Sequence, residues 1–96
     1  MHKDTKGKPK LRYVPYAALV SIAKVREFGI AKYKDDTGWR TVDQDDFIEA
    51  ALRHIGKYFD GETHDDESGL HHIDHAVTSL ALAIGVRDEK LQEKNR

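Results

Sequence analysis

Apolar residues recur at the spacing of an α-helix in two stretches of the first half of the chain. Pro15 suits the first turn of a helix, and the helical pattern continues to about Lys34. A segment of turn-forming residues follows, and a second helix is expected to run to about Phe59. An aspartate is expected to cap this second helix, because carboxylates suit the positive end of a helix; the candidates are Asp43, Asp45 and Asp46.

A third helix is expected from about Leu70 to about Ile84, with Ser68 as its N-cap and Gly85 as an interruption before a charged extension. At about 100° per residue, one arc of about 80° is entirely apolar and is predicted to face the core: Leu70, Ile73, Val77, Leu80 and Ile84. A second face alternates polar with small side chains, which leave room for a ligand or a close helix. It holds His72, His75, Ser79, Ala76 and Ala83.

No stretch alternates in the manner of a β-strand, so we predict an all-α bundle of three to four helices. The expected organisation is a basic extended arm over residues 1–14 and a single helical domain over residues 15–96. A chain of this length buries only about two-thirds of its unfolded surface. We therefore expect a homodimer or a larger homo-oligomer to complete the core.

The formal net charge is −1, but residues 1–12 carry +4 and the remainder −5. A nucleic-acid binder more often has a basic face on its folded body, so direct nucleic-acid binding is not expected, and the arm weakly favours a phosphate-bearing ligand. Neither a membrane-spanning run nor a signal peptide is evident, so a cytoplasmic protein without membrane association is expected. Without cysteine, any metal would be held by oxygen and nitrogen.

Residues 60–75, DGETHDDESGLHHIDH, hold six acids and four histidines but neither Lys nor Arg. Two interpretations are open. A solvated loop with its acids near a helix N-terminus would tolerate this repulsion. The alternative is a metal or phosphate site, because carboxylates interleaved with neutral imidazoles are the ligands that divalent-ion chemistry uses.

Other side chains also allow two interpretations. Arg26 lies in the middle of an apolar face, where it either extends its head to water or meets a partner. Trp39 either plugs an edge of the core or forms a wall of a base-binding pocket. Glu49 and Arg53 are either a surface ion pair or part of a site. Convergence of the acids, histidines and basic residues inside the bundle would suit a metal-dependent phosphohydrolase.

Five motifs occur in a defined order. They are GKPKLRYVP at 7–15, AKVREFGIAKYKD at 23–35 followed by Trp39, ALRH at 51–54, GE at 61–62 and DDESGLHHIDHA at 65–76. Together they resemble the phage-type dATP/dGTP diphosphohydrolases, a family that is similar to the MazG-type nucleotide pyrophosphohydrolases. The resemblance covers about residues 7–84, with departures at Gly38, His71, Asp74 and Ser79.

The resemblance implies a MazG-like fold and Mg²⁺-dependent hydrolysis of a purine deoxynucleoside triphosphate, dGTP or dATP, to monophosphate plus diphosphate in the cytoplasm of a phage host. The matching positions are Lys8, Arg26, Glu27, Lys32, Tyr33, Trp39, Arg53, His54, Asp65, Glu67, His72 and His75. His72 and His75 stand where related enzymes carry an acidic pair, which leaves room for Mn²⁺ or Co²⁺.

On this basis the metal ligands are expected to come from Glu27, Glu49, Asp65 and Glu67, with His72 and His75 as further ligands or proton carriers. Glu27, His72 and His75 are the expected catalytic residues. The expected substrate contacts are Lys8, Arg26, Lys32, Trp39, Arg53 and His54. Among these, Lys32 and Arg53 would neutralise the triphosphate and Trp39 would stack on the base.

Two other functions stay open. The chain could be a non-catalytic helical interaction module whose acids and histidines form a solvated cap or a structural metal site. It could also be a phosphohydrolase of the His/Asp metal type, with His54, His71, His72 and Asp74 as ligands.

Overall fold

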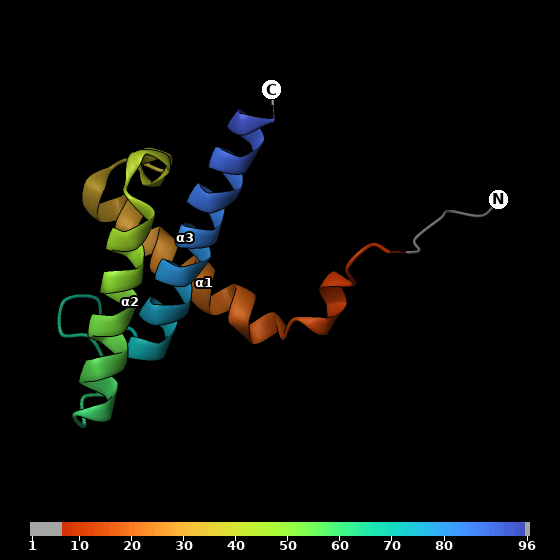
Figure 1. Ribbon diagram of the computed structural model, residues 1–96. Coiled ribbons are helices and arrows are strands. Elements are labelled where there is room, and N and C mark those ends of the chain that lie inside the picture. The colour runs from red at the N-terminus through yellow and green to blue at the C-terminus, as the bar shows by residue number, and fades with distance from the viewer. Residues whose placement is uncertain (1–6, 96) are drawn as a thin grey trace.

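The computed structural model of the chain describes residues 7–95 and is drawn in Figure 1. Over these residues it contains three α-helices, two short 3-10 turns and, besides an isolated bridge between His64 and His71, no β-structure. The helices are α1 (Tyr16–Tyr33), α2 (Gln44–Phe59) and α3 (His72–Lys94), and the turns are η1 (Leu11–Tyr13) and η2 (Gly38–Thr41). The prediction of a small all-α bundle is confirmed.

α3 is the centre of the fold, because α1, α2 and η2 all pack against it. α2 lies alongside α3, and α1 crosses behind this pair in the view of Figure 1. The N-terminal half of α1 extends away from the pair, and its Tyr16 and Leu19 are 78% and 54% exposed. Only the C-terminal half of α1 is therefore placed to contribute to a site inside the bundle.

The predicted start of α2 is confirmed in detail. Asp43 is the N-cap, and its carboxylate accepts a hydrogen bond from the backbone N–H of Asp45 at 2.8 Å. This bond satisfies one of the backbone donors that have no partner inside the helix. Asp45 and Asp46 occupy the first turn, where their negative charges suit the helix dipole.

The predicted ends of α3 are wrong. The N-cap is His71, whose Nδ1 accepts from the Ile73 backbone N–H at 3.0 Å, whereas Ser68 lies in the preceding loop. Gly85 does not interrupt the helix, which continues to Lys94. A lone glycine inside a helix costs only about 1 kcal/mol relative to alanine, and η2 packs against α3.

The core-facing side of α3 was also predicted wrongly. Ile73, Leu80 and Ile84, from the predicted core arc, are 52%, 41% and 54% exposed. Four of the five buried positions of α3 fall within about 80° of one another on a different side of the helix; they are His72, Ala76, Ala83 and Val86, and Thr78 is the fifth. Small side chains on this side let α2 approach closely, and the facing Ala51 is 1% exposed.

The first part of the predicted N-terminal arm lies outside the described residues, including Lys3 and Lys6. From residue 7 to residue 14 the chain is exposed and, apart from the turn η1, has no helical structure. The division between arm and helical domain stays a prediction. None of the described helices is both long enough and apolar enough to cross a membrane.

Candidate metal and nucleotide site

The loop between α2 and α3 fixes the position of one carboxylate. Asp65 Oδ2 accepts from the Ser68 backbone N–H at 2.9 Å, and the backbone of Asp65 bonds to Leu70 and Gly69 at 2.8 Å each. Gly69 has a φ of +72°, which residues with a Cβ rarely adopt. The His72 N–H reaches the Thr63 carbonyl at 2.9 Å, so the loop closes onto the start of α3.

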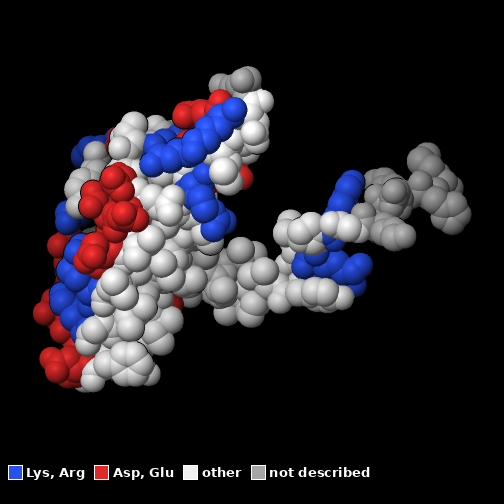
Figure 2. Space-filling view, in the orientation of Figure 1, with Lys and Arg blue, Asp and Glu red and all other residues white. Residues whose placement is uncertain are grey.

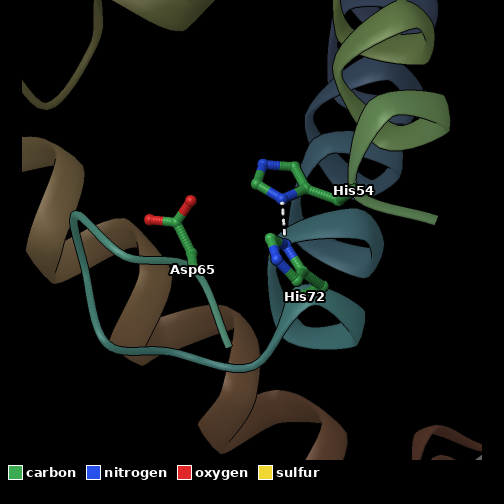
Figure 3. Close-up of side chains that lie close together, drawn as sticks. All are labelled: His54, Asp65 and His72. Carbon is green, nitrogen blue, oxygen red and sulfur yellow. Dashed lines mark hydrogen bonds between the residues drawn. The ribbon is translucent and has the colours of Figure 1, made fainter. Parts of the chain in front are cut away.

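His54 of α2, Asp65 of this loop and His72 of α3 come together at one point, as Figure 3 shows. Each contributes one possible ligand atom, and these atoms all lie within 4.8 Å of one another. The Nδ1 atoms of His54 and His72 are 2.8 Å apart, so one ring donates a proton to the other. Three side chains that are distant in sequence therefore form a single cluster.

His72 is the most deeply buried member, with no exposed surface. Its Nε2 makes no hydrogen bond among the described residues. Glu62 Oε1 lies 3.1 Å from this atom but is not aligned for a hydrogen bond. A buried polar atom without a partner costs about 1–3 kcal/mol, and such an atom calls for a ligand, a water molecule or an ion.

His75 lies one turn further along α3 and completes the cluster. Its ring stacks on His54 with centroids 4.5 Å apart. The Ser68 hydroxyl contacts His75 Nε2 at 2.6 Å, and Asp65 Oδ2 lies 3.9 Å from the same nitrogen. The i, i+3 spacing of His72 and His75 thus brings both rings to the same side of α3.

The environment favours the neutral forms of His54 and His75 beside an ionised Asp65 carboxylate. Burial lowers the pKa of His54 and of His75 below the ordinary value, and the other histidines act in the same direction. Burial alone would raise the pKa of Asp65, but the Ser68 hydrogen bonds and the nearby imidazoles lower it instead. Unprotonated nitrogens and a carboxylate are the forms that bind metal ions, so the residues of this cluster fit a divalent cation.

A polar cavity of about 330 Å³ opens beside the cluster, and Lys32 of α1 and Glu67 of the loop both line it. They form an ion pair. The hydrogen bond from Lys32 to Glu67 raises the lysine pKa, so this side chain stays a cation. The cavity therefore combines a cation, carboxylates and imidazoles; its walls include Lys32, His54, Asp65, Glu67 and His75.

A second cavity of about 420 Å³ adjoins the first and is mainly apolar. Trp39 lines it and also packs against α3, where a Cβ at Gly85 would lie only 2.7 Å from the indole ring. The Trp39 ring thus packs against α3 and also forms part of the cavity wall. Arg26 lines the same cavity, and its Nη2 donates to the Asp36 carbonyl at 2.8 Å, so the guanidinium has the partner that its position required.

The structure does not bring every expected site residue to these cavities. Glu27, Glu49, Arg53 and Lys8 are exposed and line neither of them within the described part of the chain. Glu27 lies about 200° around α1 from the cavity-lining positions Val25 and Gly29, and it therefore points elsewhere. The predicted pool of metal ligands is thus brought together only in part, through Asp65 and the histidines.

The alternative His/Asp ligand set is not assembled. His71 is engaged as the cap of α3, and the group of described residues that could hold an ion omits both His71 and Asp74. Two contacts in the structure were not predicted from the sequence: Glu62 lies beside His72, and the Ser68 hydroxyl contacts His75. The GE motif contained a signal for Glu62, whereas the expected capping role of Ser68 hid its contact with His75.

The fold and the site define an all-helical protein with a His and Asp cluster suited to a divalent cation, next to two adjoining cavities. The chain belongs to the family described as dATP/dGTP diphosphohydrolase, N-terminal, whose model matches residues 1–96. The resemblance of the motifs is thereby confirmed.

A curated relative supports this family membership. The chain is 31% identical over 94 residues to the dATP/dGTP diphosphohydrolase of Salmonella phage PMBT28, a match that covers 98% of this chain and 32% of the relative. The chain thus spans about a third of the length of that protein. No solved structure matches the chain.

Proposed function

We propose that the chain hydrolyses a purine deoxynucleoside triphosphate, dGTP or dATP, to the monophosphate and diphosphate, with a divalent cation at His54, Asp65 and His72. The observation that carries this proposal is the convergence of ligand atoms from α2, the loop and α3 within 4.8 Å, next to a cavity with a cationic wall. Membership of the family and the name of the phage relative support the choice of substrate.

The donor set bears on the choice of metal. Two imidazole nitrogens with one carboxylate oxygen suit Mn²⁺ or Co²⁺ better than Mg²⁺, which prefers oxygen ligands. When bound, the ion would polarise a phosphoryl oxygen and lower the pKa of a coordinated water molecule. The unpartnered Nε2 of His72 and the nearby Glu62 offer a further ligand pair on the buried side of the cluster.

Residues of this chain would also bind and orient the triphosphate. Lys32 stays a cation and lines the polar cavity, so its ammonium group can neutralise phosphate charge once it turns from Glu67 to the ligand. Trp39 offers an aromatic surface for the base in the apolar cavity, and Arg26 lies beside it. Lys8, Glu27, Glu49 and Arg53 line neither cavity in a single chain.

The reaction requires a proton acceptor. A water oxygen would bond to the α-phosphorus, the bond from that phosphorus to the oxygen bridging the α- and β-phosphates would break, and diphosphate would leave with that oxygen. His75 is neutral because burial lowers its pKa, and it lines the polar cavity. It can accept the proton of the attacking water at Nε2, directly or through the Ser68 hydroxyl that contacts this atom.

The proposed place of action is the cytoplasm of a phage host, because the substrate belongs to the nucleotide pool and the relative is a phage protein. We also propose that further copies of the chain cover its exposed apolar side. Figure 2 shows an uncharged band over α2 and α3 bordered by charged side chains. Large apolar side chains that are exposed on these two helices include Leu52, Ile55, Phe59, Ile73 and Ile84.

A product assay tests the proposed reaction. Purified protein is incubated with each of the eight common ribo- and deoxyribonucleoside triphosphates, with Mg²⁺, Mn²⁺ or Co²⁺ or with a chelator, and the products are separated by anion exchange. We expect monophosphate and diphosphate from dGTP or dATP, and none with chelator. Orthophosphate or triphosphate as the product would contradict the reaction class. Absence of turnover from folded protein would favour the non-catalytic interaction module.

A further inference from the structure

The two cavities share part of their lining. Val25, Gly29 and Tyr33 of α1 and Ser79 of α3 line both of them. The shared residues come from α1 and α3, two helices that pack against each other and cross in the view of Figure 1. The cavities are therefore two ends of one cleft, with these four residues at its middle.

The ends of the cleft differ in chemistry in the same way as the ends of a nucleotide. One end holds Lys32, Glu67 and the His–Asp cluster, and the other holds the apolar rings of Trp39 and Phe47. Volumes of about 330 and 420 Å³ are in the range of small-molecule sites. With phosphates at the ionic end and a base at the apolar end, the sugar would lie at the middle of the cleft.

Gly29 stands out at this middle position. It lies inside α1, where glycine is a poor helix former, and a Cβ built on it meets no atom within 4 Å. Gly85 gives the contrast, because a Cβ there would collide with Trp39. Packing within the chain therefore explains glycine at 85 but not at 29, where the free space opens into the cleft.

Ser79 lies on the other wall at the same level. Its hydroxyl makes no hydrogen bond with any of the described residues, although it is partly buried and lines both cavities. Thr78, the preceding residue, instead donates to the Asp74 carbonyl at 2.7 Å. The Ser79 hydroxyl is thus available for a ligand hydroxyl.

We propose that Gly29 and Ser79 form the sugar-binding part of this cleft, and that Gly29 determines specificity by leaving room for a sugar between base and phosphates. The inference rests on the proposed nucleotide hydrolysis and deepens it. It predicts that a side chain at 29 excludes nucleotides while leaving the cation cluster and the binding of a phosphate chain without sugar or base unaffected.

The test uses matched glycine variants. Gly29→Ala and Gly29→Leu are compared with Gly56→Ala and Gly56→Leu, because Gly56 is also inside a helix with no atom near its Cβ but lines neither cavity. The measurements are Tm, Mn²⁺ binding, and calorimetric binding of dGMP and of inorganic tripolyphosphate in the presence of Mn²⁺. Turnover of dGTP is measured in parallel.

Both alanine variants should raise Tm by about 4–8 °C, since each removes a helix-interior glycine. Gly29→Leu should weaken dGMP binding by about ten- to a hundredfold through overpacking, with Gly29→Ala in between. Tripolyphosphate and Mn²⁺ binding should stay unchanged, and the Gly56 variants should bind all three probes like the unmodified protein. Ser79→Ala should weaken dGMP binding by about three- to tenfold.

Equal dGMP affinity in Gly29→Leu and the unmodified protein, with dGTP turnover intact in both, would overturn the sugar-binding inference and leave the proposed function standing. Parallel losses of dGMP and tripolyphosphate binding in Gly29→Leu would also overturn it, because position 29 would then act on the phosphate end. If the unmodified protein neither binds dGMP nor hydrolyses any triphosphate, both proposals fall together.

Discussion

The two sides of α3 differ in the apolar residues that they bury: the small ones face the bundle and the large ones face solvent. The side that packs inside the bundle carries His72 with no exposed surface, together with small side chains. The other side carries Ile73, Leu80 and Ile84, each more than two-fifths exposed. Apolar residues normally avoid water, and a buried histidine requires partners. The buried side therefore holds a histidine that needs a partner, and the other side exposes large apolar residues to solvent.

Small residues on the buried side of α3 allow a neighbouring helix to pack closely against it. Ala76 and Ala83 let α2 come close, and the short distance brings the ring of His54 to the ring of His72. Larger side chains on this face would separate the helices and with them the ligand atoms. Close helix packing and the geometry of the site thus depend on the same side of α3, whereas the large apolar residues lie on the other side.

The largest expected effect comes from removing the charge of the loop carboxylate that meets the buried histidine of α3. Asp65→Asn keeps the size of the side chain and an oxygen that can accept from the Ser68 N–H. Turnover and Mn²⁺ affinity should fall by more than the about 10- to 100-fold that the loss of an outer-shell partner costs. Calorimetry with Mn²⁺ and the product assay measure this. Asp66→Asn, an exposed neighbour, is the control, and an equal loss in both would argue against a ligand role.

The next largest effect concerns the packing of this side. Ala76 is 6% exposed, so Ala76→Leu should overpack the α2–α3 contact and cost about 1–3 kcal/mol of unfolding free energy. Ile84→Ser on the other side should change the stability of a single chain by about 0.5 kcal/mol or less. Chemical denaturation measures both. Sedimentation of the Ile84→Ser variant reports whether copies assemble through the exposed side. A larger loss of unfolding free energy in Ile84→Ser than in Ala76→Leu would contradict the contrast between the two sides.

A smaller effect is expected where η2 meets α3. Gly85→Ala gains about 1 kcal/mol of helix propensity but places a Cβ 2.7 Å from the Trp39 ring. The ring must move, so the net change in stability should be small or unfavourable and the tryptophan fluorescence should shift to the red. Gly56→Ala serves as a control because nothing lies near its Cβ. An unchanged emission spectrum in Gly85→Ala would mean that Trp39 is not held there.

The smallest effect concerns pH in the metal-free protein. Burial lowers the pKa of His54 and His75 below the ordinary 6.5, so the unfolded chain binds more protons at mildly acidic pH. Their contribution is fully present above about pH 6.5 and is lost as pH falls through the folded-state pKa. Tm measured after chelation should therefore decrease from pH 7 to pH 5. His75→Gln should flatten this decrease, and a Tm that rises on acidification would contradict the assigned direction.

The positions of the helices along the chain could be predicted from the sequence better than the side of each helix that is buried. Helical spacing and the turn residues located α1, the Asp43 cap and the end of α2, because these depend on local interactions. The core side of α3 was missed because the apolar arc was assumed to be buried, whereas contacts with α2 decide which side faces inward. The helix start was missed because Ser68 bonds within the loop and leaves the cap to His71.

The sequence indicated which types of residue would form the candidate site, but not every residue that lies in it. The acid and histidine stretch indicated a metal site, and Asp65, His72 and His75 do come together. His54 was expected as a substrate contact, but its ring lies in the cluster itself. Glu27 was expected as a ligand from the family resemblance and Glu49 as a further acid on a neighbouring helix, and both side chains are exposed in the structure. Spacing along one helix cannot fix its rotation toward another.

The central claim is that imidazoles of α2 and α3, together with Asp65, hold the catalytic cation. Electron spin echo envelope modulation of the Mn²⁺-loaded protein tests it directly, because a bound imidazole nitrogen modulates the manganese signal. The account predicts nitrogen modulation from the unmodified protein, weaker modulation in His54→Gln and weaker Mn²⁺ binding in Asp65→Asn. A manganese signal without nitrogen modulation, from protein that hydrolyses dGTP, would place the ion among carboxylates elsewhere and contradict it.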